Sequence, residues 1–454
     1  MFRRIREGVV RIAKTSESDS NALPVLEKSL QPLLSTASVI YCGLSFVRRL
    51  LYRNGFLTQT RLPVPVVSVG NITWGGNGKT PMVETLSRWF LGAGICPLIL
   101  TRGYAGGDEA QMLQMHLEGS CAKLGVGVNR VEIAHEILFK YGILSSQQRT
   151  EKAESLNVEY DDNSTKVWRS REGKIGVAII DDGMQVVNAL CFDQCRFFTA
   201  IELWVHTVQL SFNGHVMLQH LPLARDLEVV MVNVISLWGN QRTIPRGPLR
   251  ESLGELRRAD VVVLHHADLV SEERVQGIKD ELSEHLRQDS IVICSSMSPQ
   301  YLYRPPAPAT EAGLQPRIQT HSRLPLDTLK NSVVLSVSGV GCPEALSLIL
   351  ERLGAHHVER MDYVDHHSFD MKDIQDVERR CVKLQAQFQG RAVLLVLTEK
   401  DYVREPFIWS KVSFVKVFIL HACLRLISCT SSLVDFRKVL VKVASSSLIE
   451  GDIR

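Results

Sequence analysis

The 454-residue sequence lacks the features that define several protein classes. None of its ten cysteines form a Cys-x-x-Cys pair, and the closest two, Cys191 and Cys195, have no neighbouring histidines or cysteines to complete a zinc site. Scattered thiols of this kind are typical of a protein that is not secreted. The net charge is only +3, which is too small to indicate a nucleic acid as the partner. No internal repeat of short period is present.

Long apolar runs are also scarce. Residues 33–51 are apolar, but the stretch is short and is interrupted by Arg48 and Arg49, which argues against a membrane span. Two interpretations remain: a basic-ended helix in a membrane interface, or a helix packed on the first domain. Before it, five basic residues and one acid precede a Ser-rich stretch, a composition that resembles an organellar transit peptide. A disordered basic tail is the alternative.

The stretch from Val64 to Pro81, VPVVSVGNITWGGNGKTP, indicates a nucleotide site. A β-branched run predicts a buried strand, and a glycine loop then leads to Lys79 and Thr80 at the start of a helical pattern. Such a loop lets backbone N–H groups surround phosphate oxygens, and the helix N-terminus adds its positive end. We expect Lys79 to reach the β- and γ-phosphates and Thr80 to bind Mg²⁺. The strict motif has glycine where this chain has Thr73, and a plain glycine turn is the alternative.

Two acids follow a later apolar strand, IGVAII, at residues 175–180. Asp181 and Asp182 therefore stand where an NTPase holds Mg²⁺, downstream of a phosphate loop. Two adjacent carboxylates do not easily face one ion, so we expect one to bind metal and the other to orient a group or act as a base. A common Asp-Asp-Gly turn is the alternative.

Strand and helix patterns alternate through both halves of the chain, which predicts an α/β fold with doubly wound sheets. The first half contains the glycine loop that leads to Lys79 and Thr80, which is the expected phosphate-binding loop (P-loop). A second α/β unit starts near residue 259.

Nine blocks of sequence resemble the tetraacyldisaccharide 4′-kinase family, the lipid A 4′-kinases. They occur in family order between about residues 61 and 402: VPVVSVGNITWGGNGKTP, TRGY, GGDEAQML, IIDDGMQ, ARDLEVV, IPRGPLRE, SGVGCP, DYVDHHSF and LTEKDY. Threonine at the first loop position is the family's own variant, which accounts for Thr73. Because the chain also starts like a transit peptide, the resemblance is to a plant-type mitochondrial member.

The resemblance implies transfer of a phosphoryl group from ATP, with Mg²⁺, to the 4′-hydroxyl of a tetraacylated glucosamine disaccharide 1-phosphate in lipid A biosynthesis. It implies that Asp108 accepts the hydroxyl proton, that His366 partners Asp108, and that the loop of Arg250 and Glu251 closes on the phosphates and the metal. The implied catalytic residues are Asp108, His366 and Asp182. The implied nucleotide-binding residues are Thr73, Gly75, Gly76, Asn77, Gly78, Lys79, Thr80 and Arg250. The implied metal ligands are Thr80, Asp181 and Glu251.

The organisation expected from these observations has four parts. They are a transit-peptide-like tail (1–32), a membrane-associated helix (33–58), a P-loop kinase domain (59–258) and a second, smaller α/β domain (259–454). We expect an acylated disaccharide lipid and a membrane surface as partners, no nucleic acid, and a monomer. The expected location is the mitochondrion, peripheral to or associated with its inner membrane.

The sequence departs from the family at residues 186–219, which separate Asp-Asp-Gly-Met-Gln from the histidine and basic stretch that should follow at once. We interpret this irregular segment as a translated intron or a variant transcript. If it is genuine protein, we expect a disordered extrusion and much reduced activity. The tail after about residue 407 also no longer resembles the family's end. The alternative functions are a P-loop switch or metallochaperone-type NTPase, and an inactive paralogue that retains nucleotide binding only.

Overall fold

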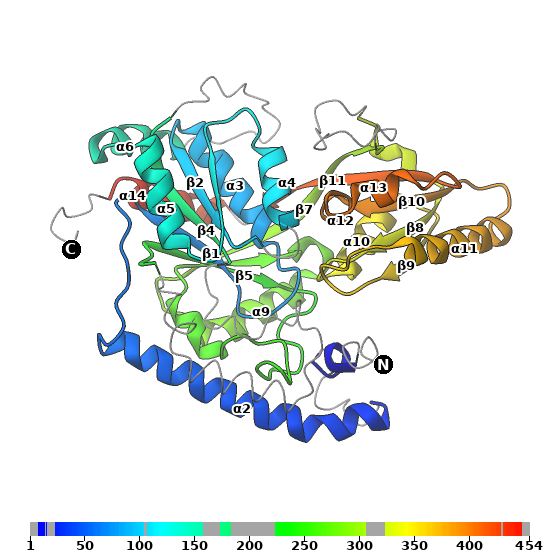
Figure 1. Ribbon diagram of the computed structural model, residues 1–454, viewed down its shortest axis with the longest axis horizontal. Coiled ribbons are helices and arrows are strands. Elements are labelled where there is room, and N and C mark those ends of the chain that lie inside the picture. Colours follow the sequence, from blue (N-terminus) through cyan, green and yellow to red (C-terminus); the bar gives the residue numbers. More distant parts are fainter. Residues whose placement is uncertain are drawn as a thin grey trace. The chain divides into compact units, whose positions relative to one another are not determined.

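The computed structural model of the chain, shown in Figure 1, describes residues 8–13, 15, 23–103, 107–157, 173–182, 223–305, 323–427 and 430–446. The predicted insert at 186–219 and residues 1–7, 14 and 16–22 of the transit-peptide-like tail lie outside these residues. The chain divides into two compact units. The first unit comprises residues 1–102, 119–294 and 426–454, and the second comprises residues 103–118 and 295–425.

A parallel sheet forms the centre of the first unit. Its strand order is β3 (Lys123–Val126), β2 (Cys96–Thr101), β4 (Ile175–Asp181), β1 (Val66–Gly70), β5 (Leu227–Asn233) and β6 (Val261–His265). Neighbouring strands in this series pair in parallel. Every residue of β1, β4 and β5 is buried, as expected for parallel strands covered on both faces. The strand predicted from the Val-rich run is therefore the central β1.

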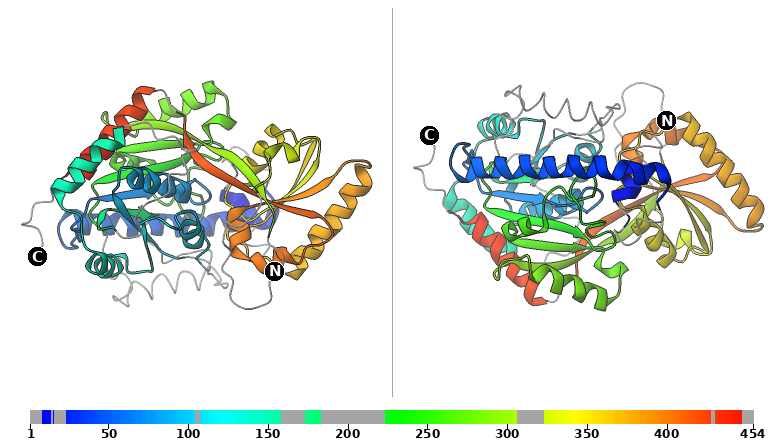
Figure 2. Two further views of the ribbon diagram at one scale, coloured as in Figure 1. Left: turned by 90° about the horizontal axis from the view of Figure 1, so that it is seen from above. Right: turned by 90° about the horizontal axis from the view of Figure 1, so that it is seen from below.

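Helices of the first unit complete the α/β arrangement. They include α2 (Val25–Arg53), α3 (Lys79–Gly92), α5 (Arg130–Tyr141), α6 (Ser146–Ala153), α9 (Glu272–Ser283) and α14 (Thr430–Ala444). The long α2 lies across one side of this unit (Figure 2). It begins at Val25, eight residues before the predicted start at residue 33. A small buried cluster of Val9, Ile12, Leu23 and Leu34 packs the first described residues against it.

The second unit is a smaller α/β layer. Its strand order is β11 (Lys416–Leu426), β10 (Val393–Thr398), β8 (Val333–Ser338) and β9 (His357–Asp362), all paired in parallel. Its helices are α4 (Asp108–His116), α10 (Pro343–Arg352), α11 (Met371–Gln387), α12 (Glu399–Arg404) and α13 (Pro406–Ser410). Tyr303, Phe369 and Trp409 are the large side chains of its core.

The α/β class agrees with the sequence prediction. The predicted domain ranges stay a prediction, and the two compact units have limits of their own. The strand β7 (Ile291–Tyr303) contains the boundary between Cys294 and Ser295, and β11 contains the boundary between Arg425 and Leu426. The segment with α4, which lies between strands of the first unit in sequence, belongs to the second unit.

Candidate active site

The phosphate loop joins the end of β1 to the first turn of α3. Gly78 caps α3 with a left-handed φ of 78°. A Cβ at this position would lie 2.6 Å from Nε2 of His265, which ends β6, so both the conformation and the space require glycine. The local fold thus presents the N-terminus of α3, with Lys79 and Thr80 as its first residues, to a ligand.

Two asparagines hold the glycine loop in shape. The Asn77 side-chain amide donates to the carbonyl oxygen of Gly75 at 2.9 Å, and that of Asn233, at the end of β5, donates to the carbonyl oxygen of Gly76 at 3.0 Å. These bonds fix the loop in a conformation from which backbone N–H groups can bind an anion. Asn77 and the three glycines were predicted from the motif, whereas Asn233 was missed.

Thr73 anchors the loop through its backbone. It forms an isolated antiparallel bridge with Leu249, and the N–H of the next residue, Trp74, donates to the carbonyl oxygen of Pro248 at 2.9 Å. The hydroxyl of Thr73 lies 3.4 Å from Oδ1 of Asn77. A glycine is therefore not needed at this position, which removes the objection that the strict motif raised. Thr73 as a nucleotide ligand stays a prediction.

The hydroxyl of Thr80 donates to Oδ2 of Asp181 at 3.1 Å. Both side chains are buried, at the start of α3 and the end of β4. A hydroxyl and a carboxylate in contact are oxygen ligands of the kind that Mg²⁺ takes in P-loop proteins. Two of the three predicted metal ligands are thus brought together, and their chemistry fits a magnesium ion.

The carboxylate of Asp182 forms ion pairs with two cations. Its Oδ1 lies 2.7 Å from Nη1 of Arg250 and 3.8 Å from Nζ of Lys79, and its backbone has a left-handed φ of 57°. Burial alone would raise the pKa of Asp182, but Arg250 and Lys79 outweigh it and hold this pKa below its usual range. An ionised carboxylate that binds both cations is suited to position them, and its predicted role as a catalytic group stays a prediction.

Glu251 has a different environment from its neighbour Arg250. Its buried carboxylate pairs with Nη2 of Arg258 at 2.5 Å. Burial raises the pKa of Glu251 to about 7 despite this pair. Its predicted role as a metal ligand stays a prediction, because that role requires the ionised form and competes with Arg258.

Helix α2 is hydrogen-bonded to the loop that carries Arg250. The hydroxyl of Tyr41 donates to the carbonyl oxygen of Arg250 at 2.8 Å, and that of Ser38 donates to the carbonyl oxygen of Thr243 at 2.7 Å. The N–H of Arg246 donates back to the Ser38 hydroxyl at 3.1 Å. Sequence reasoning missed these contacts. The signal was available, because Ser38 and Tyr41 stand three residues apart on one face of an apolar helix.

A second cluster is built around Asp108 in the second unit. Asp108 begins α4 and is 1% exposed. Its Oδ2 lies 3.1 Å from Nδ1 of His366, 3.0 Å from Nε of Arg404 and 2.7 Å from Nη2 of Arg404. The predicted pair of Asp108 and His366 is therefore brought together, although 258 residues separate the two in the chain.

Opposite pKa shifts follow from this arrangement. For Asp108, burial would raise the pKa, but the hydrogen bond from His366 and the charges of Lys400 and Arg404 hold it well below its usual range. For His366, burial would lower the pKa, but the hydrogen bond to Asp108 outweighs it and raises the pKa above the ordinary value. The pair is thus held as a carboxylate beside a readily protonated imidazole.

Lys400 completes the cluster and, with Arg404, was missed by sequence reasoning. Its Nζ lies 3.2 Å from Oε1 of Glu109, 3.3 Å from Nε2 of His366 and 3.5 Å from Oδ1 of Asp365. Burial opposes its charge, but the surrounding carboxylates raise the pKa of Lys400. The LTEKDY block, which places charged residues directly after a buried strand, was the available signal.

Comparisons with known proteins agree on one family. A family model described as tetraacyldisaccharide-1-P 4′-kinase matches residues 30–189 and 217–432. A protein of Arabidopsis thaliana named "Probable tetraacyldisaccharide 4′-kinase, mitochondrial" is 37% identical over 445 residues, covering 98% of each chain. A tetraacyldisaccharide 4′-kinase of Halothermothrix orenii is 28% identical over 84% of each chain.

A solved structure supports the fold. It is described as the "apo" form of LpxK from Aquifex aeolicus in complex with ATP, and it matches with a TM-score of 0.51. The match covers 92% of this chain and 99% of that chain, at 21% sequence identity.

The family match has one internal gap, at residues 190–216. This gap lies within the segment 186–219 that was predicted to be foreign to the family. The match continues to residue 432, however, so the prediction that the resemblance ends near residue 407 is wrong. The strand β11 and the start of α14 lie in this later part.

Proposed function

Because the chain belongs to the tetraacyldisaccharide-1-phosphate 4′-kinase family, we propose that it transfers the γ-phosphoryl group of ATP to the 4′-hydroxyl of an acylated disaccharide 1-phosphate. The single observation that supports this most strongly is the buried contact of Asp108 with His366 and Arg404, in a chain that also has a glycine loop leading into α3. A lipid kinase needs both parts: a cradle for the nucleotide and a base for the sugar hydroxyl.

The first unit supplies the nucleotide side. The glycine loop and the N-terminus of α3 bind the phosphates, and Lys79 and Arg250 neutralise the charge that spreads over the γ-phosphoryl oxygens. Asp182 contacts both cations and so positions them for the nucleotide. Thr80 and Asp181 would hold Mg²⁺, which when bound shields the phosphate oxygens from each other.

The second unit supplies the acceptor side. Asp108 is ionised and its Oδ2 is bound by His366 and Arg404, so the carboxylate is fixed in direction. A low pKa makes it a weak base. In a loose transition state the hydroxyl proton leaves late, so the position of the Asp108 carboxylate matters more than its basicity. His366 then orients Asp108 and stabilises its charge, as the partner in other base–orienter pairs does.

The alternatives account for fewer of the contacts. A switch or metallochaperone-type NTPase requires the P-loop and its acids but has no use for the Asp108 cluster. An inactive paralogue would bind ATP and yield no phosphorylated lipid. The family membership favours the kinase over the switch.

The proposed activity is tested with purified full-length protein, labelled ATP, Mg²⁺ and tetraacyldisaccharide 1-phosphate in detergent micelles. We expect a doubly phosphorylated lipid whose formation depends on Mg²⁺. Protein that binds ATP and forms no such lipid would support the inactive paralogue. ATP hydrolysis without lipid phosphorylation, coupled to nucleotide-dependent dimerisation, would support the switch.

We further propose that α2 lies on a mitochondrial membrane, peripheral to or associated with the inner membrane. The relative from Arabidopsis thaliana is named as mitochondrial, and α2 is long and apolar enough to cross a membrane by length and composition. Its Leu34, Ser38 and Tyr41 are buried, whereas Phe46 and Val47 are exposed. An apolar exposed side with three arginines near the helix end suits an interface better than the interior of a bilayer.

The membrane proposal predicts a loss of vesicle binding when the exposed side of α2 becomes polar. Combined replacement of Val39, Phe46 and Val47 by serine is expected to weaken binding to vesicles of cardiolipin and phosphatidylcholine at least about tenfold, because each buried apolar side chain contributes roughly 1.5–3 kcal/mol. Vesicle flotation measures the effect. Phe139→Ser, at a residue of α5 that is 94% exposed, is the matched control. Equal flotation of all three proteins would contradict the proposal.

A further inference from the structure

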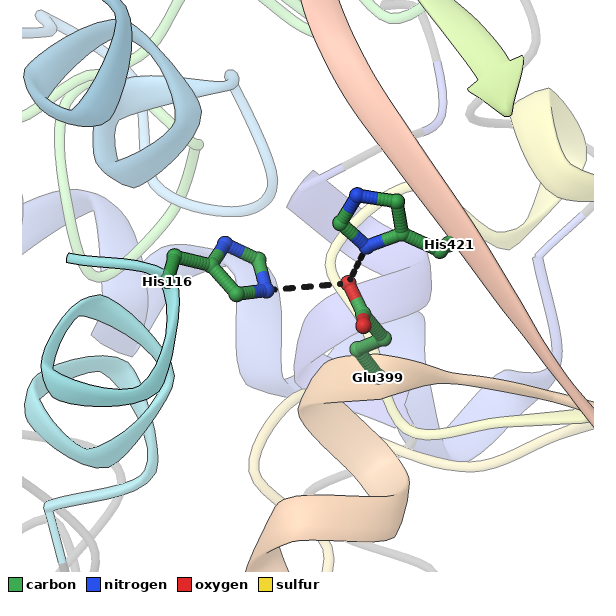
Figure 3. Close-up of side chains that lie close together, drawn as sticks. All are labelled: His116, Glu399 and His421. Carbon is green, nitrogen blue, oxygen red and sulfur yellow. Dashed lines mark hydrogen bonds and ion pairs between the residues drawn. The ribbon is translucent and has the colours of Figure 1, made fainter. Parts of the chain in front are cut away.

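Two histidines of the second unit converge on one buried carboxylate. His116 ends α4, Glu399 begins α12 and His421 lies in β11 (Figure 3). Oε2 of Glu399 lies 2.8 Å from Nδ1 of His421 and 3.3 Å from Nε2 of His116. The side chains of His116, Glu399 and His421 are 4%, 6% and 10% exposed, respectively. This cluster has no part in the phosphoryl transfer described above.

We propose that His116, Glu399 and His421 bind a structural divalent transition-metal ion of the zinc type. The ligand atoms all lie within 4.8 Å of one another. In a tetrahedral zinc site with bonds of about 2.0–2.1 Å, neighbouring ligand atoms are separated by roughly 3.3 Å. The separation of His116 Nε2 and Glu399 Oε2 already has this length, and that of His421 Nδ1 and Glu399 Oε2 is about half an ångström shorter. The ligand nitrogens of the two histidines lie within 4.8 Å of each other. Small side-chain shifts would therefore admit the ion.

The ligand chemistry selects this class of metal. Two imidazole nitrogens and one carboxylate oxygen suit zinc and its neighbours, whereas magnesium and calcium prefer sites made of oxygen alone. The Oε2 atom of Glu399 faces both histidines, so it supplies the one oxygen ligand of such a site.

The ligands are themselves held by outer contacts, as metal ligands usually are. The hydroxyl of Tyr303 donates to Oε1 of Glu399 at 3.2 Å, which leaves Oε2 for the ion. Nε2 of His421 contacts Sγ of Cys423 at 3.6 Å, and the ring of Tyr301 stacks on His421 at 4.6 Å. These contacts orient the His421 ring so that Nδ1 faces the carboxylate.

The position of the site gives it a function within the second unit. Its ligands join the end of α4, the start of α12 and the strand β11. Asp108 begins α4, and Lys400 and Arg404 belong to α12. A bound ion would therefore fix the distance between the helices that hold Asp108 and the cations that contact it. The site is structural, since all three ligands are buried and none is needed for the chemistry.

The proposal is tested by metal analysis of the purified full chain. The protein is stripped with a chelator, loaded with Zn²⁺ in the presence of excess Mg²⁺ to occupy oxygen sites, and dialysed. We expect about one zinc per chain by mass spectrometry, and less than about a tenth of this for His116→Gln and His421→Gln. The matched control His356→Gln changes an exposed histidine of the same unit and is expected to retain the metal. Far-ultraviolet circular dichroism checks that the variants are folded.

A second measurement keeps the proposal testable if the variants fail to fold. Wild-type protein loaded with Co²⁺ is expected to show the strong visible absorption of a tetrahedral nitrogen-ligated site, and Zn²⁺ is expected to raise its melting temperature. Wild-type protein that retains no zinc and shows no such absorption overturns the proposal, and so does stoichiometric zinc in both folded variants. The cluster would then be a hydrogen-bonded trio without a metal. These readouts do not depend on kinase activity, so a failed lipid assay and a failed metal assay are distinguishable.

Discussion

Replacement of Asp108 by asparagine is expected to lower kcat for lipid phosphorylation by about 10²–10⁴-fold, the usual effect of removing a general base. The amide has nearly the same shape but cannot accept the proton. ATP binding should be unchanged, because the P-loop belongs to the other unit of the chain. Lipid phosphorylation and ATP affinity are measured on the same preparation. Asp376→Asn, at a half-exposed carboxylate of α11, is the matched control.

The pH dependence separates the role of Asp108 from that of its partner. Since the pKa of Asp108 is held well below about 3.9, its protonation should not limit the rate between about pH 5 and pH 8. The assignment of Asp108 as the base would be contradicted if activity were lost on acidification with a midpoint above pH 5, and if Asp108→Glu shifted that midpoint. His366→Asn is expected to lower kcat less than Asp108→Asn does, because it removes an orienting group and leaves the carboxylate.

The ionisation of His366 also predicts the direction in which the stability of the protein changes with pH. This imidazole faces Asp108, Lys400 and Asp365. Its folded pKa is raised, so its contribution to the free energy of unfolding is complete below about pH 6.5 and is lost as the pH rises through the folded value. His366→Asn should therefore destabilise the protein more at pH 6 than at pH 9, as urea unfolding can measure.

The elements of the fold could be predicted where burial produces a simple pattern. The strands β1 and β4 are buried throughout and mostly apolar because helices cover both faces of a parallel sheet. Two limits of the units could not be predicted, because they fall inside β7 and β11. A strand that continues through a boundary shows no change of composition there, and the sequence offers a linker signal only where the chain is irregular.

The candidate site was predictable to the extent that its residues lie in local motifs. Lys79 and Thr80 follow a glycine loop, and Asp181 ends a buried strand. Asp108 and His366 carry no local signal and came only from the resemblance. Arg404 could not be found at all, because its contact with Asp108 spans 296 residues and depends on how the second unit folds. Long-range ion pairs of this kind leave no periodic trace in the sequence.

Replacement of Lys79 by alanine is the second change with a large expected effect. Its ammonium group is the cation at the first position of α3, where the γ-phosphoryl group carries charge in the transition state. Loss of one such electrostatic contact costs about 10²–10³-fold in kcat. We expect kcat/KM to fall by at least about 10²-fold, since ATP affinity also falls. Lys140→Ala, an exposed lysine of the same unit, is the matched control.

A double-mutant cycle with Asp182→Asn then decides what Asp182 does. Its carboxylate contacts Lys79 and Arg250, which indicates that it acts by positioning them. If so, the effects of Lys79→Ala and Asp182→Asn are not additive, because the double variant loses the same interaction only once. Additive losses in kcat would instead assign Asp182 a separate catalytic contact with the substrate or the metal. A Lys79→Ala protein with more than about a tenth of the wild-type kcat/KM would contradict the proposed nucleotide site itself, because one transition-state donor accounts for at least about 10²-fold.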